Sequence, residues 1–430
     1  MSRKMKGSGI EWIGDIPEDW KVVKNKYVFF RKKELVNKEW GSTQLLSLTT
    51  KGIVTKDINN LEGKLPESFS TYQHIKKNDL VLCLFDLDMS AVFNGLSKYN
   101  GMISPAYKRY VLKTIGDMRY YNYLYDFIFY DRTYKNYSTT LRFTLDNQEF
   151  DRIPTIKPNI NTQIKIADFL DYKIGLIEKT KSKINEGIKT LEDYKKSVIT
   201  EAVTKGLDKN VEMKDSGIEW IGEIPEYWEI RRIKDITIKS ERGTSPTYTE
   251  DDTKSKVVNQ STFSRGIFDK NNIRFSNIPT KTSKGLLKSN DVLIASTGGG
   301  VLGKTHYFQE QDEYVADGHV TILRTNPAIQ NSKIIYYFFY PNFDLINGIL
   351  SKGATNQTEL QADLLKNFKL PVSSIDEQEQ IVDYLDKKTK IIDEAIAAKQ
   401  KQLEILEEYK KSLIYEYVTG KKEVEDVGTI

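Results

Sequence analysis

Two long stretches of the chain repeat apolar side chains every seven residues and contain no proline. In residues 161–204 and again in residues 376–419 the repeat continues over several turns, which is typical of helices that pair in a coiled coil. A helix of about 42 residues is roughly 63 Å long at about 1.5 Å per residue, too long to fold back into a small globule. The residues predicted to pack between the helices are Leu170, Ile177, Ile184, Leu191, Val198, Leu385, Ile392, Leu406 and Leu413.

Each of these helices is expected to be the partner of the other. A chain that leaves along one helix, builds a globule and returns along the second helix favours an antiparallel pair within one molecule. The alternative is that each helix packs against a helix of another protein.

The rest of the chain has short apolar runs broken by Gly, Asn, Asp and Pro. Runs such as 43–48, 79–85 and 107–113 predict strands, and residues 120–130 predict a short helix. The predicted fold class is α/β (α+β) with two lobes, an internal repeat with pseudo-two-fold symmetry, and two long antiparallel helices between the lobes. The predicted boundaries are 1–152 for the first lobe, 153–206 for the first helix, 207–369 for the second lobe, and 370–430 for the second helix and tail.

A thirteen-residue segment supports the duplication directly. Residues 8–20 and residues 216–228 are identical at eleven of thirteen positions. We call them the repeat segments, and we expect their Trp and Ile side chains to pack each lobe against the helices. The lobes themselves hardly match, although residues 77–80 and 289–292 share an Asn-Asp pair that suggests one common fold.

The composition says more about the cellular compartment of the protein than about its function. The 430 residues carry a formal net charge of +4, which neither requires nor excludes nucleic acid. Cys83 is the only cysteine, so no internal disulfide can form, and its apolar surroundings predict a buried thiol. Three scattered histidines give no adequate ligand set for a protein zinc site. With no long apolar run and no secretory signal, a cytoplasmic protein is expected.

Residues 298–305 match a phosphate-binding loop literally, with Gly303, Lys304 and Thr305 at its end. Such a loop must open a helix whose amide groups hold the phosphates. Residues 306–314 have no helical apolar period, so we predict a glycine-rich turn and not a nucleotide site. No other catalytic grouping stands out in the chain.

Basic residues alternate with tyrosines in residues 107–142, and further basic residues lie in the second lobe. This arrangement suits a protein that holds DNA phosphates with Lys and Arg and reads base edges with polar side chains. For any single lysine, a role as a solvated surface residue is the simpler interpretation. Taken together, the pattern favours nucleic-acid binding.

These features resemble the DNA specificity subunit of type I restriction-modification systems. The resemblance rests on the repeat segments, on the two helices that end in Tyr-Lys-Lys-Ser, on residues 291–304, and on residues 353–357. It covers essentially the whole chain. One departure is that the first lobe lacks the Gly-Gly…Gly-Lys segment and has residues 85–90 in its place.

The resemblance implies a protein without catalysis of its own. Two target recognition domains would each read one half of a split site in double-stranded DNA. The helices would set the spacer and dock two methyltransferase (modification) subunits, which restriction (helicase-nuclease) subunits join. S-adenosylmethionine, ATP and Mg would be used by those partners, with no cofactor, metal or membrane bound by this chain.

Candidate DNA-binding residues are the polar and basic residues of the loops: Arg31, Lys32, Arg109, Arg142, Arg242, Thr244, Lys304 and Gln357. Two other classes stay open on the sequence. One is a two-lobed coiled-coil adaptor that grips other proteins, and the other is an ATP-binding enzyme built on residues 298–305.

Overall fold

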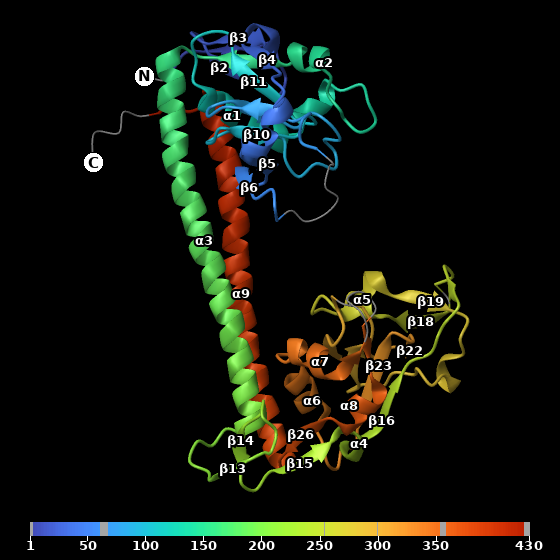
Figure 1. Ribbon diagram of the computed structural model, residues 1–430. Helices are drawn as coiled ribbons and strands as arrows, with labels where there is room; N and C mark the ends of the chain where they lie inside the picture. Colours follow the sequence, from blue (N-terminus) through green and yellow to red (C-terminus); the bar gives the residue numbers. More distant parts are fainter. Residues whose placement is uncertain (1–2, 61–67, 253, 299, 353–357, 425–430) are drawn as a thin grey trace. The chain divides into compact units, whose positions relative to one another are not determined.

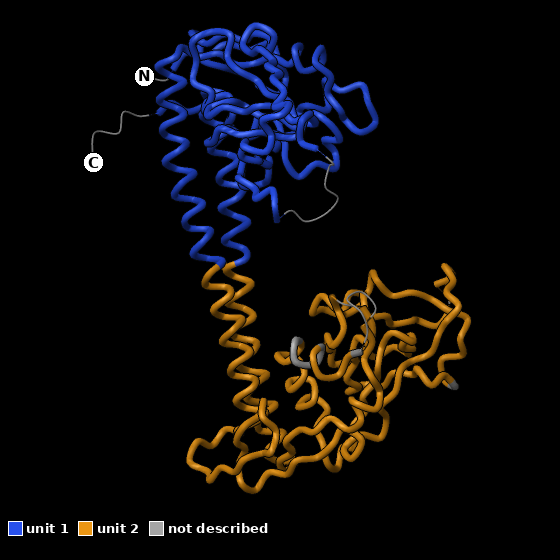
Figure 2. The backbone as a smooth tube through the Cα atoms, viewed as in Figure 1, with its two compact units in different colours: residues 1–185, 400–430 blue, residues 186–399 orange. Residues whose placement is uncertain are grey.

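The computed structural model describes residues 3–60, 68–252, 254–298, 300–352 and 358–424, which form two compact units (Figure 2). Unit 1 comprises residues 1–185 and 400–430, and unit 2 comprises residues 186–399. Each unit holds one lobe together with part of helix α3 (Ile160–Lys205) and part of helix α9 (Ile375–Val418). Both helices lie within one residue of the limits predicted from the apolar repeat.

Unit 1 has a lobe of short strands and two helices (Figure 1). Its strands are β1 (Met5–Gly7), β2 (Asp15–Pro17), β3 (Lys21–Lys24), β4 (Phe29–Lys32), β5 (Leu45–Thr49), β6 (Gly52–Lys56), β7 (Gln73–Ile75), β8 (Leu80–Leu82), β9 (Asn94–Leu96), β10 (Gly101–Ile103), β11 (Lys108–Leu112) and β12 (Pro154–Lys157), and its lobe helices are α1 (Met118–Tyr130) and α2 (Asn147–Arg152). The predicted start of the first helical segment at residue 153 is wrong, because β12 still pairs with β3 in the lobe.

Unit 2 follows the same plan with more short helices. Its strands are β13 (Met213–Asp215), β14 (Glu223–Pro225), β15 (Glu229–Arg232), β16 (Thr237–Arg242), β17 (Tyr248–Thr249), β18 (Ser255–Val258), β19 (Arg274–Ser276), β20 (Val292–Ala295), β21 (Thr305–Tyr307), β22 (Tyr314–Ala316), β23 (Val320–Thr325), β24 (Ser351–Lys352), β25 (Glu359–Leu360) and β26 (Lys369–Val372), and its lobe helices are α4 (Ile233–Ile236), α5 (Gln260–Phe263), α6 (Ser332–Phe339), α7 (Phe343–Leu350) and α8 (Ala362–Asn367). Residues 370–372, predicted to begin the second helical segment, belong to β26, which pairs with β15.

One four-stranded antiparallel sheet has the same strand order in both lobes. The order is β4-β11-β8-β9 in unit 1 and β16-β23-β20-β21 in unit 2. Before β8 and before β20, Asn78 and Asn290 take left-handed backbone angles with φ of 70° and 75°. The next residue accepts a backbone N–H on its carboxylate, Asp79 from Lys76 and Asp291 from Lys288. The shared Asn-Asp pair therefore marks one common fold, as the sequence suggested.

Apolar side chains of the repeat segments pack against the long helices within each unit. In unit 1, Ile16 and Trp20 belong to the same apolar cluster as Leu170, Leu413 and Val418. In unit 2 the equivalent cluster contains Ile224 and Trp228 together with Val203 and Leu385. The prediction that these segments pack each lobe onto the helices is confirmed.

The long helices run antiparallel in each unit. In unit 1, Lys181 pairs with Glu407 at 2.6 Å and Lys410 pairs with Glu178 at 2.8 Å, so residue numbers rise on one helix as they fall on the other. In unit 2, Lys195 pairs with Asp393 at 2.8 Å. Of the residues predicted to pack between the helices, six are buried and three partly buried: Leu170, Ile177, Val198, Leu385, Ile392 and Leu413 in the first group, and Ile184, Leu191 and Leu406 in the second.

A polar contact also ties a lobe helix to a long helix in each unit. In unit 1, Arg119 and Tyr123 of α1 bind the Asp171 carboxylate at 2.8 Å and 2.6 Å. In unit 2, Lys333 and Tyr337 of α6 bind Asp386 in the same way. In both copies, a basic residue and a tyrosine of the lobe helix thus bind an aspartate of the long helix and hold the lobe to it. None of the described helices is long and apolar enough to span a membrane.

Candidate nucleic-acid interface

One edge of the shared sheet is built from the ends of the same three strands in both lobes. In unit 1, β4 and β8 end there and β11 begins there; in unit 2, β16 and β20 end there and β23 begins there. In each lobe, we call these strand ends, with the loops that follow or precede them, the loop edge of that lobe. The first loop edge comprises residues 31–35, 83–93 and 104–108, and the second comprises the described residues of 242–244, 296–304 and 317–319 together with Gln260 of α5, which contacts Thr297.

Three of the predicted residues lie in the second loop edge. Arg242 ends β16, and its guanidinium lies 3.2 Å from the Leu360 carbonyl oxygen and 3.4 Å from the Glu359 carboxylate. The Thr244 amide donates to the Ala316 carbonyl at 3.0 Å, which fixes the loop beside β22. Lys304 is half-buried, with its ammonium 5.8 Å from the centre of the Phe343 ring. Gln357 lies outside the described residues.

The segment that matches a phosphate-binding loop connects two antiparallel strands. It runs from the end of β20 into β21, and Ile294 lies opposite Thr305 in the sheet. Gly298 and Gly303 have positive φ values of 90° and 85°, which an L side chain would strain. Because a strand follows it, this turn has no helix whose amide groups could hold a nucleotide. The predicted glycine-rich turn is confirmed.

The first loop edge gathers positive charge. Arg31 and Lys33 lie on one face of the strand, since side chains alternate along it. Burial lowers the pKa of Lys108, and the nearby charges of Arg31 and Lys33 lower it further. Like charges on neighbouring strands cost stability, so an anion on this face would be favourable. The strand pairing places Lys32 at the position of Glu241, because each lies opposite the residue that pairs with Val81 or Leu293. Lys33 therefore lies at the position of Arg242, so both edges place a cation there.

Lys33 and Lys108 were missed as individual candidates, whereas Lys32 was chosen. Lys32 points to the opposite face, where its ammonium lies 3.9 Å from the Glu34 carboxylate. Strand alternation applied to residues 31–33 would have separated Lys32 from its two neighbours. Arg31 also donates to the Asn147 side chain at 2.8 Å. Arg142 is 79% exposed and lies 3.7 Å from Asp86, so its contact with DNA stays a prediction.

The prediction for Arg109 is wrong. Its side chain is 1% exposed, its Nε lies 2.6 Å from the buried Asp79 carboxylate, and it donates to the His74 carbonyl at 2.9 Å. In unit 2, Arg324 binds Asp291 through two bonds of 2.7 Å. A buried carboxylate needs such a partner, so Arg109 stabilises the sheet and has no surface to offer DNA.

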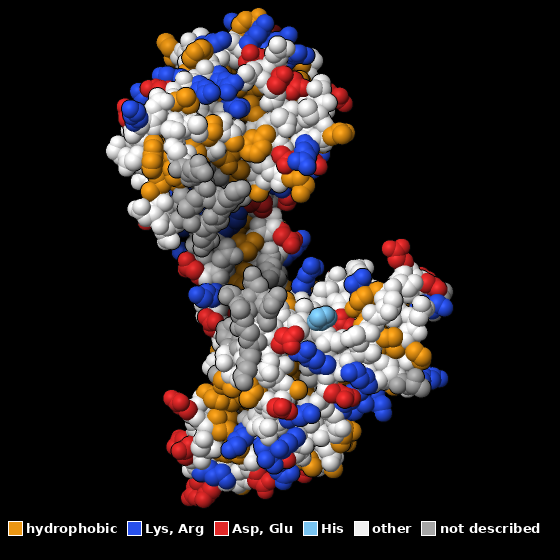
Figure 3. Space-filling view, turned by 45° about the vertical axis from the view of Figure 1, so that its right-hand side comes forward, with side chains coloured by type: hydrophobic (Ala, Val, Ile, Leu, Met, Phe, Trp, Pro, Cys, Tyr) orange, Lys and Arg blue, Asp and Glu red, His pale blue; other side chains and the backbone are white. Residues whose placement is uncertain are grey.

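Surface charge alone does not locate the interface. Figure 3 shows Lys and Arg side chains interspersed with Asp and Glu over the visible face of both units. The second loop edge instead carries a polar network that includes Thr297, His319 and Gln260. These three residues were missed because they lie far apart in the sequence.

The fold and its edges define a class of protein: a duplicated scaffold with constant helix-packing elements and two divergent loop edges. The type I restriction modification DNA specificity domain matches residues 225–405. A chain solved in a study of complex assembly and conformational transition of the type I R-M system has the same fold, with a TM-score of 0.69 at 14% identity. That match covers 95% of this chain and 99% of the solved one.

Two curated relatives come from Methanocaldococcus jannaschii. The type I restriction enzyme MjaVIII specificity subunit is 26% identical over 292 residues, which is 66% of this chain and 65% of the relative. The putative type I restriction enzyme MjaX specificity subunit is 26% identical over 204 residues, 46% of this chain and 47% of the relative. The matches thus span less than two thirds of either relative. The chain is therefore similar to type I restriction-modification specificity subunits, through the domain matched at residues 225–405 and through relatives at 26% identity.

Proposed function

We propose that this chain is the DNA specificity subunit of a type I restriction-modification complex. Each lobe reads one half of a bipartite site in double-stranded DNA, and the long helices set the spacer between the halves. The chain performs no catalysis; S-adenosylmethionine, ATP and Mg serve the modification and restriction subunits. Such a complex acts on DNA in the cytoplasm.

The observation that carries this proposal is the contrast between the scaffold and the loop edges. Strand order, the Asn-Asp pair and the helix contacts are the same in both lobes. The loop edges differ: the first gathers Arg31, Lys33 and Lys108, whereas the second carries Thr297 and His319. Two different surfaces on one scaffold suit the recognition of two different sequences.

The helices also offer one surface twice, which fits two copies of one partner. In unit 1, Leu176 and Tyr409 are 45% and 51% exposed and lie within two residues, along their helices, of Glu178 and Lys410, which form an ion pair. In unit 2, Ile391 and Tyr194 are 62% and 50% exposed and occupy the equivalent positions, within two residues of Asp393 and Lys195, which also form an ion pair. Exposed apolar side chains at equivalent positions of a duplicated protein favour two identical docked subunits. We assign these surfaces to two modification subunits.

Selection from a random DNA library tests the proposal. The full chain, co-purified with the modification subunit of the same host, is expected to enrich DNA with two conserved blocks at a constant separation. Binding should weaken steeply as salt rises, because phosphate contacts release counterions. A library that stays random, together with salt-insensitive binding to another protein, would support the adaptor interpretation instead.

A further inference from the structure

The polar network at the second loop edge holds an exposed histidine in one orientation. The His319 Nδ1 lies 2.9 Å from the Thr297 hydroxyl, and that hydroxyl donates to the Gln260 Oε1 at 3.3 Å. The His319 amide donates to the buried Asp317 carboxylate at 2.8 Å, and the Tyr248 hydroxyl donates to the same carboxylate at 2.9 Å. Both the backbone and the ring of His319 are therefore fixed before any ligand binds.

The donors and acceptors of this network can be counted. Thr297 has a single hydroxyl proton, which goes to Gln260, so its oxygen accepts the proton on Nδ1 of His319. With its proton on Nδ1, the ring presents Nε2 as the acceptor. Gln260 has used its oxygen and keeps its amide NH₂ as a donor. The edge thus presents one acceptor and one amide donor.

This pair of groups matches one base in the major groove. Adenine offers an N6 donor beside an N7 acceptor, guanine offers two acceptors, and cytosine offers a donor alone. We propose that His319 and Gln260 read an adenine in the half-site bound by the second lobe, with His319 Nε2 accepting from N6 and Gln260 donating to N7. Thr297 is the positioning residue. The inference rests on the proposed function and deepens it.

The first loop edge has no such network. Substitutions in the network should therefore change base preference only in the half-site read by the second lobe. Counted from the shared Asn-Asp pair, Phe85 lies at the position of Thr297. Its ring is 41% exposed and packs against Tyr107 with the ring centres 6.1 Å apart. Phe85 has no hydrogen-bonding side-chain group at the position where Thr297 holds the histidine ring, so the half-site read by the first lobe serves as an internal control.

The test compares base preference in the selected DNA for the wild-type chain, His319→Ala, Gln260→Ala and Thr297→Val, each in complex with the modification subunit. We expect the preference for adenine at one position of one half-site to fall by about 10- to 100-fold, the range for a good bidentate contact. The other half-site should be unchanged. Because His319 is exposed, its removal leaves the core intact, and Thr297→Val keeps the shape of that side chain while freeing the ring.

Base analogues at the affected position separate the two contacts. 2-Aminopurine removes the N6 donor, so it should weaken the wild-type chain and leave His319→Ala unaffected. 7-Deazaadenine removes the N7 acceptor, so it should weaken the wild-type chain and leave Gln260→Ala unaffected. If the variants select the same bipartite site as the wild type, or if a base other than adenine is lost, the inference is wrong while the proposed function stands. If the wild-type chain selects no site, the proposed function itself fails.

Discussion

A buried tryptophan of each repeat segment differs in its hydrogen bonding between the copies, and so does the residue at the equivalent position in the first turn of the long helix. Gln163 of α3 and Gln378 of α9 occupy equivalent positions, because the side chain of each accepts a hydrogen bond from a backbone N–H of its lobe, at 2.9 Å and 2.7 Å. The preceding residue is Glu377 in unit 2, which accepts from Trp228 Nε1 at 3.0 Å. In unit 1 it is Thr162, and the buried Nε1 of Trp20 has no hydrogen-bond partner among the described residues.

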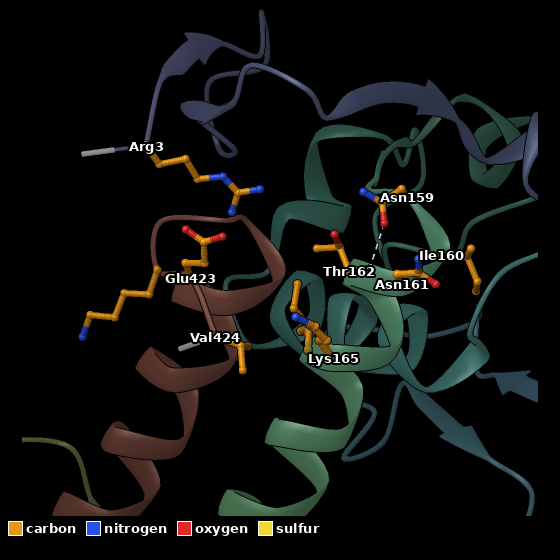
Figure 4. A pocket seen from close by; sticks show the side chains of 10 residues that line it. Arg3, Asn159, Ile160, Asn161, Thr162, Lys165, Glu423 and Val424 are labelled. Atoms are coloured by element: carbon orange, nitrogen blue, oxygen red, sulfur yellow. Dashed lines mark hydrogen bonds between the residues drawn. The ribbon is translucent and has the colours of Figure 1, made fainter. Parts of the chain in front are cut away.

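The space around Thr162 can take a longer, acidic side chain. Thr162 lines a pocket of about 380 Å³ together with Arg3 and Lys165, at the start of α3 (Figure 4). Arg3 also lies over the ring of Trp20, with its guanidinium carbon 5.2 Å from the ring centre. A carboxylate here would be near the cations of Arg3 and Lys165 and the positive end of the helix dipole, although Glu423 also lines the pocket.

Exchanging these two residues should therefore change stability in opposite directions. We expect Thr162→Glu to raise the free energy of unfolding by about 1 kcal/mol, because Trp20 gains a hydrogen bond. Glu377→Thr should lower it by about 1–3 kcal/mol, because Trp228 Nε1 is left buried and unpaired. Denaturant unfolding measures both.

Asn161→Glu is the matched control, since it adds the same charge to the same helix turn at the neighbouring position. A gain for Thr162→Glu no larger than that for Asn161→Glu would show that the helix dipole alone is responsible. The unpaired Nε1 of Trp20 would then make no measurable difference to the free energy of unfolding.

Among the elements, those with a strong local pattern were predictable and those that depend on pairing were not. The long helices were placed to within a residue because the seven-residue repeat and the lack of proline are local signals. Arg109 was misplaced because its partner, Asp79, reaches it only through the pairing of β8 with β11. The hydrogen-bond network of the second loop edge was not predicted, because His319, Thr297 and Gln260 come together only when β20, β23 and α5 are in place.

The strand pair β4–β11 gives a prediction about DNA affinity. Lys108→Gln removes one cation from the first loop edge without emptying a core position, since its side chain is only partly buried. We expect binding to weaken about equally for all DNA sequences and the salt slope to fall by about 1. Affinity measured over a salt series, on a specific and an unrelated duplex, tests this.

Lys401→Gln is the control for this measurement. Lys401 is 69% exposed on α9 and pairs only locally, with Glu404 at 2.8 Å. Its removal changes the net charge equally but should leave the salt slope unchanged. Equal effects of both substitutions would mean that net charge, and not the first loop edge, governs DNA affinity.

For the whole molecule, the central claim is that two lobes read two half-sites whose separation the helices set. Residues 189–195 of α3 and residues 393–399 of α9 face each other in unit 2, with the Lys195–Asp393 pair at one end of the segment. Removing both segments deletes one seven-residue repeat from each helix, so the apolar residues that pack between the helices stay aligned. Each helix becomes shorter by about 10 Å, which corresponds to roughly three base pairs of DNA.

The most direct test of this claim is a map of methylated bases in the genome of cells that carry the chain and its modification subunit. With the wild-type chain, we expect methylation at a site of two half-sites separated by a constant spacer, and no such methylation without the chain. With the shortened helices, the same two half-sites should appear with a spacer about three base pairs shorter. Methylation that does not depend on the chain, or a spacer that is unchanged when the helices are shortened, would contradict the account.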